Sequence, residues 1–127
     1  GFPNHYARIG GTWQQDALIH DDQAIVVAVR DKGLVILTGC GHAGAINTIR
    51  YAQKVTGVPR VHAVLGGLHL TGTVFEPLID PTVAALKAMN PTLIVPAHCT
   101  GWRATHALAR ELPDAFVANS VGTRFLM

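Results

Sequence analysis

Residues 33–44 read GLVILTGCGHAG and join an apolar strand to a helix through a glycine-rich turn. A short apolar run that gives way to glycines is typical of a buried strand and the turn after it. Apolar residues then recur at helical spacing from 45 to 55, and Gly57 ends the helix. This unit predicts an α/β fold in which Cys40 and His42 lie just beyond the end of a strand.

The rest of the chain continues the alternation of strands and helices. The predicted strands span residues 23–30, 34–37, 60–65, 91–95, 115–118 and 123–127, and the predicted helices span 45–55, 81–89 and 102–112. Asp80 is expected to cap the second helix, with Pro81 at its first position. The order β-β-α-β-α-β-α-β-β predicts a mixed, mostly parallel sheet with antiparallel pairs at its edges.

Composition and charge narrow the class of protein. The 127 residues are 49% hydrophobic and 14% charged, which is typical of a compact folded domain. Residues 1–22 are polar, so we expect an irregular lead-in segment there and a single α/β domain over 23–127. The net charge is +2 and the basic residues are scattered, so we expect no nucleic-acid partner. With no bilayer-length apolar run and no leader pattern, we expect no membrane segment and a cytoplasmic protein.

Three histidines follow the ends of predicted strands. His42, His69 and His98 lie in the stretches TGCGH, GGLH and PAHC. Ligands bind outside the carboxyl ends of the strands in an open α/β sheet, and imidazole is a common ligand of metal ions. These residues therefore predict a metal site. Cys40 is either a thiolate ligand or a small packing residue, and packing is the favoured role of Cys99.

The glycine-rich turn and the two cysteines admit other interpretations. Residues 39–44, GCGHAG, match the dinucleotide-binding fingerprint. That fingerprint expects an acidic residue about twenty positions further on, but no acidic residue lies between this turn and Glu76. A nucleotide-binding module is therefore the less favoured hypothesis. Cys40 and Cys99 each lie within two residues of a histidine, which favours reduced thiols near a site over a disulfide.

Four stretches of the chain together resemble the metallo-β-lactamase superfamily. They are DDQA at 21–24, the unit at 33–44, GGLHL at 66–70 and PAHCTG at 96–101. Within the superfamily they are similar to the branch of dihydropterin-aminobenzene ribofuranosyl phosphate synthase-like hydrolases. The resemblance implies a metallo-β-lactamase-like half-sandwich, a mixed sheet with helices on one face.

The resemblance also implies a metal-dependent hydrolase in which an activated water attacks an ester or a phosphoester, as in a phosphodiesterase. Zn²⁺ is the expected metal, with Mn²⁺ or iron as alternatives, in one or two ions. His98 matches the last metal-ligand motif, His42 an internal one, and His69 a branch motif that binds metal or substrate. We predict His42, His69, His98 and Cys40 as metal ligands, and Asp22 and His69 as catalytic residues, with Asp22 either a general base or the partner of a ligand.

One hallmark of the superfamily is missing from these residues. The motif His-x-His-x-Asp-His does not occur, and in the resembling proteins it lies in the N-terminal half. The chain is therefore expected to correspond to the C-terminal half of the sandwich. An uncovered apolar sheet face favours a partner, either a second copy in a homodimer or the missing N-terminal half. The alternative function is a non-catalytic metal-binding half-module that requires such a partner.

Overall fold

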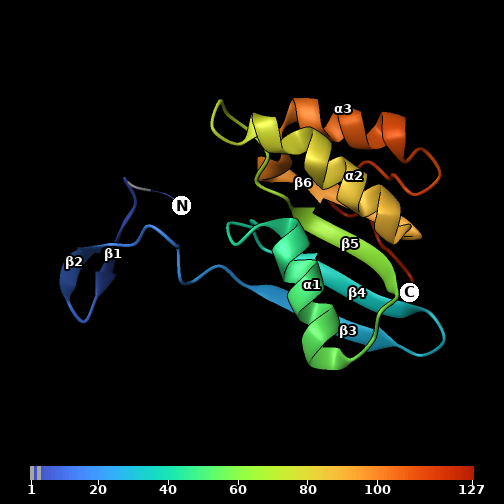
Figure 1. The fold of residues 1–127 in the computed structure, drawn as a ribbon, viewed down its shortest axis with the longest axis horizontal. Helices are drawn as coiled ribbons and strands as arrows, with labels where there is room; N and C mark the ends of the chain where they lie inside the picture. The colour runs from blue at the N-terminus through green and yellow to red at the C-terminus, as the bar shows by residue number, and fades with distance from the viewer. Residues whose placement is uncertain (1, 3) are drawn as a thin grey trace.

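A four-stranded sheet forms the centre of the computed structural model, which describes residue 2 and residues 4–127 (Figure 1). Its strands, in spatial order, are β3 (Ala24–Val29), β4 (Gly33–Thr38), β5 (Val61–Gly67) and β6 (Leu93–Ala97). β3 and β4 form an antiparallel hairpin, whereas β4, β5 and β6 run parallel. The predicted mixed, mostly parallel sheet is confirmed.

Three helices cover one face of this sheet (Figure 1). They are α1 (Ala45–Thr56), α2 (Ile79–Met89) and α3 (Trp102–Glu111). α1 joins β4 to β5, and α2 joins β5 to β6. Each parallel connection thus contains a helix, as is usual for parallel strands. α1 ends at Gly57, which has a φ of 71° and donates its N–H to the Gln53 carbonyl, a left-handed helix end that glycine adopts without strain.

The hydrophobic core lies between the sheet and the three helices. Cross-strand neighbours Ile36, Val64 and Ile94 point to the helices from β4, β5 and β6. They pack in one cluster with Ile49 of α1 and Leu86 of α2, and each of these side chains is at most 1% exposed. The burial of this cluster fixes the helices on the sheet and, with them, the turns at the strand ends.

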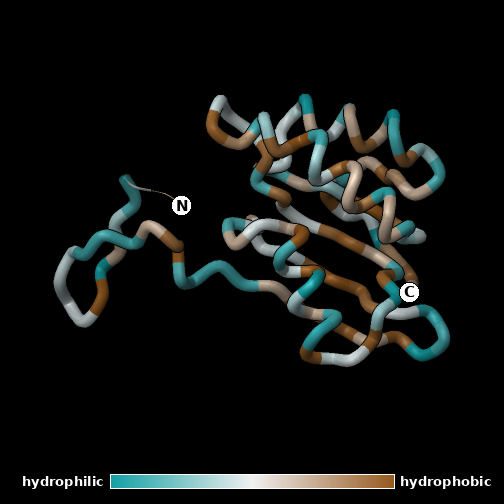
Figure 2. The backbone as a smooth tube through the Cα atoms, viewed as in Figure 1, coloured by the Kyte–Doolittle hydropathy of each residue, from teal (hydrophilic) through white to brown (hydrophobic). Residues whose placement is uncertain are grey.

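The opposite face of β3 and β4 is apolar and uncovered. Ile25 and Leu37 are register partners, as are Val27 and Val35, and the exposed fractions of Ile25, Val27 and Leu37 are 62%, 49% and 43%. We call these four residues the outer apolar face. Figure 2 shows apolar residues along both strands. Adjacent residues of β4 therefore face opposite environments, Ile36 in the core and Leu37 outside it.

The lead-in expected to be irregular contains a β-hairpin instead. β1 (Tyr6–Ile9) pairs antiparallel with β2 (Thr12–Gln15), and the two strands form a separate sheet that stands apart from the main one in Figure 1. Gly10 and Gly11 make the turn with φ values of 60° and 89°, a conformation that favours glycine at both positions. The hairpin is largely exposed, so the sequence lacks the apolar alternation that marks a half-buried strand.

Two other expectations were wrong. The predicted strands at 115–118 and 123–127 are absent from the described residues, apart from one parallel bridge between Ile94 and Phe116. Asp80 does not cap α2, because the 3₁₀ turn Glu76–Leu78 runs directly into the helix and places Asp80 inside its first turn. In the part of the chain that the structure describes, every helix is too short or too polar to cross a bilayer.

Alanine substitutions at Ile36 and Leu37 test which face of β4 is covered. Ile36→Ala leaves a cavity in the core and should lower the free energy of unfolding by about 2–5 kcal/mol. Leu37→Ala removes a partly exposed side chain and should cost less than half as much. Both values come from urea unfolding followed by circular dichroism, at a protein concentration at which the chain is monomeric. An equal loss in the two variants would contradict the uncovered outer apolar face.

Candidate metal centre

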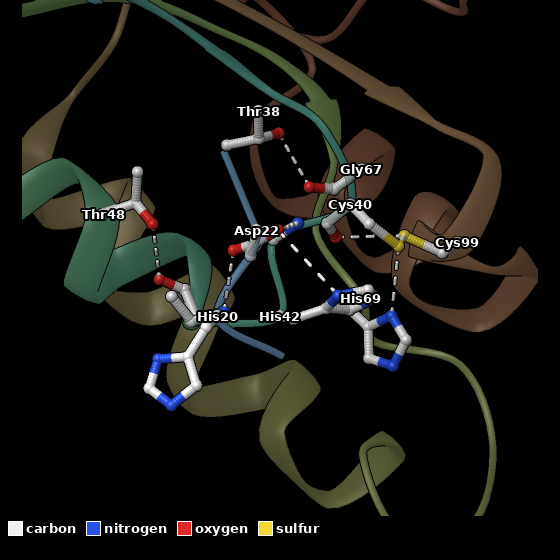
Figure 3. A network of polar contacts seen from close by, with 12 residues as sticks. His20, Asp22, Thr38, Cys40, His42, Thr48, Gly67, His69 and Cys99 are labelled. Atoms are coloured by element: carbon white, nitrogen blue, oxygen red, sulfur yellow. Dashed lines mark hydrogen bonds and ion pairs between the residues drawn. The ribbon is translucent and has the colours of Figure 1, made fainter. Parts of the chain in front are cut away.

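The predicted ligands meet at the carboxyl edge of the sheet. Cys40 and His42 lie in the turn between β4 and α1, and His69 follows β5 (Figure 3). His98 and Cys99 open the 3₁₀ turn His98–Thr100 that follows β6. The parallel order of β4, β5 and β6 brings these three turns side by side, as expected for strand ends in an α/β sheet.

The donor atoms form two groups that share one sulfur. The donors of Cys40, His42 and His69 lie within 4.8 Å of one another, and so do those of Cys40, His98 and Cys99. The Cys40 sulfur is 3.3 Å from His69 Nδ1 and 2.9 Å from the Cys99 sulfur. The structure thus divides the four predicted ligands between two overlapping groups and adds Cys99.

Hydrogen bonds hold the three turns together. The Thr38 hydroxyl donates to the Gly67 carbonyl at 2.7 Å, and the Leu68 N–H donates to the buried Thr100 hydroxyl at 3.2 Å. The Leu70 N–H donates to the Cys99 carbonyl at 3.2 Å. The Thr100 hydroxyl therefore links the turn after β6 to the turn after β5. These bonds fix the relative positions of the donor groups.

Gly67 provides the space for two of the donors. A Cβ atom at this position would lie 2.6 Å from the Cys99 sulfur and 2.7 Å from His98 Nε2. Such distances are far inside van der Waals contact, so only glycine allows both side chains to approach β5. His69, two residues on, has a φ of 46°, a left-handed conformation that is uncommon for a side chain of this size. The backbone is therefore shaped around the cluster.

Asp22 supports the turn that carries His42. One carboxylate oxygen accepts the Gly41 N–H at 3.2 Å and the other accepts the Ala43 N–H at 2.9 Å. The first of these oxygens is 4.0 Å from His42 Nδ1, too far for a hydrogen bond. His42 Nδ1 is buried and has no hydrogen-bond partner among the described residues. A buried nitrogen without a partner suits a metal ligand.

Burial and neighbouring charges shift two pKa values in the cluster. Burial, the hydrogen bond with Cys99 and the charges of Cys99 and Asp22 raise the pKa of the Cys40 thiol to about 12. Burial lowers the pKa of His69, as do His42 and His98, and Asp22 opposes them. His69 therefore stays in the neutral form that binds metals, whereas Cys40 keeps its proton at neutral pH until a cation displaces it.

The donor set fits a divalent ion of borderline softness such as Zn²⁺. Three imidazoles and two thiols converge, a glycine leaves room for them, and one imidazole nitrogen is buried without a partner. Sequence reasoning assigned Cys99 to packing. The sequence did contain a signal that Cys99 is a candidate ligand, because Cys99 directly follows His98, much as Cys40 lies two residues before His42.

A cavity of about 450 Å³ opens beside His42 and His69. Its wall includes Arg50 from α1 and Phe75 from the loop before α2. The rings of His42 and His69 meet edge to face with centroids 4.5 Å apart, and Phe75 lies 4.7 Å from His69 in the same arrangement. The cavity thus places a cation and an aromatic side chain next to the donor cluster, and the sequence alone did not identify either residue.

A mixed sheet covered by helices on one face, with histidines and cysteines at the carboxyl edge, is an α/β fold of the metallo-β-lactamase type with a candidate metal site. The fold is that of the metallo-β-lactamase superfamily. It superposes with a TM-score of 0.83 and 29% identity on the crystal structure of Tm1679, described as a metal-dependent hydrolase of the beta-lactamase superfamily. That match covers 96% of this chain and 46% of Tm1679.

Two curated relatives from Methanocaldococcus jannaschii agree with this assignment. One is 7,8-dihydropterin-6-methyl-4-(beta-D-ribofuranosyl)-aminobenzene-5'-phosphate synthase, 33% identical over 96 residues, which are 76% of this chain and 32% of that protein. The other is the uncharacterized protein MJ0448, 35% identical over 104 residues, which are 82% of this chain and 36% of that protein. The chain spans about a third of the length of these relatives. No family model matches it.

Gly67→Ala tests whether the cluster depends on this missing side chain. The added methyl group should push Cys99 and His98 away from Cys40 and lower Zn²⁺ affinity by at least about tenfold, as lost ligand orientation does in other metal sites. Affinity is measured by competition with a chromophoric chelator. Gly39→Ala is the matched control, because its Cβ would meet only the Gln23 carbonyl at 3.2 Å. Equal affinity in folded Gly67→Ala and the wild type would contradict the role of Gly67.

Proposed function

We propose that this chain is a metal-dependent hydrolase that acts on phosphoesters. The observation that carries the proposal is the thiol–imidazole cluster, two of whose members, His42 and His69, line a cavity with Arg50 in its wall. The similarity to a metal-dependent hydrolase supports the reaction class. The cluster supplies the metal ligands and the cavity the room for a small substrate.

The ligands in this proposal are His42, His69, His98 and Cys40, with Zn²⁺ as the preferred metal and Mn²⁺ or iron as alternatives, in one or two ions. When bound, the metal activates a water molecule and polarises the scissile group. Asp22 is a positioning residue for His42, because both of its carboxylate oxygens accept backbone hydrogen bonds from the turn that carries His42. His69 lines the cavity as well as the cluster, so its ring contacts the substrate.

The preference for phosphoesters rests on positive groups near the cluster. Arg50 offers a guanidinium to a phosphate oxygen at the cavity wall. α3 begins directly after the His98–Thr100 turn, and the N–H groups of its first turn favour an anion. The relative named as an aminobenzene-5'-phosphate synthase is consistent with a substrate that carries phosphate. A cytoplasmic location stays a prediction.

The alternative is a non-catalytic metal-binding half-module that works with a partner. The outer apolar face favours it, because exposed Ile25, Val27 and Leu37 form a patch that association would cover. The partial span of the relatives also favours it. A second copy of this chain or a domain equivalent to the rest of those relatives would serve as the partner, and the His-x-His-x-Asp-His residues would then come from that domain.

Metal analysis combined with turnover separates the two functions. The purified chain should bind Zn²⁺ and hydrolyse bis-p-nitrophenyl phosphate, and a chelator should abolish turnover. His42→Ala and His98→Ala should each lower turnover by at least about 100-fold, since even an outer partner of a ligand is worth roughly 10- to 100-fold. His106→Ala, on α3, is the control for loss of a histidine elsewhere. A folded wild type that binds stoichiometric metal without any turnover would refute the hydrolase and favour the half-module.

The mass of the chain in solution tests the homodimer. We expect a dimer by sedimentation, held by the outer apolar face, and Leu37→Lys should shift it to a monomer because a buried, unpaired ammonium opposes association. Val55→Lys introduces the same charge at an exposed apolar position of α1 and should leave the dimer intact. A monomeric wild type would rule out self-association and leave a separate domain as the partner.

A further inference from the structure

Cys40 and Cys99 face each other across the carboxyl edge although 59 positions separate them in the sequence (Figure 3). The Cys40 thiol donates to the Cys99 sulfur at 2.9 Å, and the Cys99 thiol donates to the Cys40 carbonyl at 3.1 Å. Both cysteines are free and half-buried, so a small reagent can reach them. The two thiols form a pair in direct contact.

The sulfur–sulfur distance lies between those of two chemical states. A disulfide bond is about 2.05 Å long. Two thiolates on one tetrahedral Zn²⁺, each at about 2.3 Å from the ion, lie roughly 3.8 Å apart. From 2.9 Å, a movement of about 0.9 Å reaches either state. Hydrogen bonds hold the turns that carry the two sulfurs, so the two thiols are kept close to each other.

The two states exclude each other at the metal centre. Cys40 belongs to both donor groups, and Cys99 belongs to the group with His98. A metal ion binds the thiolate form of cysteine, which a disulfide no longer offers. Closing the pair would therefore remove a donor from the group of His42 and His69, and two donors from the group of His98.

We propose that Cys40 and Cys99 form a redox switch that controls metal binding at this centre, an inference that rests on the metal-binding part of the proposed function. In the reduced state both sulfurs bind the metal ion. In the oxidised state they form a disulfide and the ion is released. The switch responds to low-molecular-weight disulfides, the class to which oxidised glutathione belongs.

The oxidation balances as two thiol–disulfide exchanges. One cysteine thiolate attacks a sulfur of the small disulfide, which forms a mixed disulfide and releases one small thiolate. The second cysteine then attacks the protein sulfur of the mixed disulfide and expels the other small thiolate. Two protein thiols become one disulfide, and their two protons and two electrons appear in two small thiols.

Cobalt binding and intact mass together test the switch on the full chain. Reduced, metal-free protein should bind Co²⁺ with a near-ultraviolet thiolate-to-cobalt absorption band. Oxidised glutathione should remove both free thiols and lower the mass by two hydrogens. Co²⁺ affinity should then fall by more than the roughly 10- to 100-fold that loss of an outer partner causes. A reductant should restore the band and the affinity.

Cys99→Ser is the matched control for the second exchange. Without the neighbouring thiol, glutathione should stay attached to Cys40 and raise the mass, and Cys99→Ala provides the same readout if the serine variant does not fold. A stable glutathione adduct on the wild type, or a disulfide that leaves Co²⁺ affinity unchanged, would overturn the proposal. A chain that switches but never hydrolyses a phosphoester would refute the hydrolase alone. Hydrolysis that survives disulfide formation would refute the switch alone.

Discussion

The close contact of three strand-end turns is the constraint on which the rest of the structure depends. The Thr38 hydroxyl binds the Gly67 carbonyl, and the Thr100 hydroxyl binds the Leu68 N–H, so β4, β5 and β6 end at fixed positions relative to one another. Gly67 allows this contact because it has no Cβ to collide with Cys99 and His98. These contacts set the distances between the donor groups.

The sheet and its helices make these contacts possible, and they leave one face of the sheet uncovered. Parallel pairing of β4, β5 and β6 puts their carboxyl ends on a single edge, and the core around Ile36 and Ile94 holds the helices on one face. The antiparallel pairing of β3 with β4 places Ile25 and Leu37 side by side on the other face, where both are exposed to solvent. The gathering of the candidate ligands at the carboxyl edge and the exposure of the outer apolar face are thus two consequences of one topology.

The sequence predicted elements that are built by burial and missed those built by local geometry. The apolar runs of β4 and β5 and the helical spacing of α1 identified the sheet and its first helix correctly. The hairpin at Gly10-Gly11 escaped because its strands are exposed and carry no apolar alternation. The sequence pattern favoured packing for Cys99. The approach of Cys99 to Cys40 depends on the turn after β6 and on the space at Gly67, and the periodicity of the sequence reveals neither.

The number of donor side chains in each group decides whether a metal site can form without the His-x-His-x-Asp-His motif. Catalytic zinc sites use three protein ligands and keep a fourth position open, and each of the two donor groups offers three. The chain therefore carries enough ligands for an open site from its own turns. Both groups include Cys40, so this thiol would be a ligand in either of them. Cys40 is the one residue common to both groups, whereas each histidine belongs to only one of them, so the candidate site depends on Cys40 more than on any single histidine.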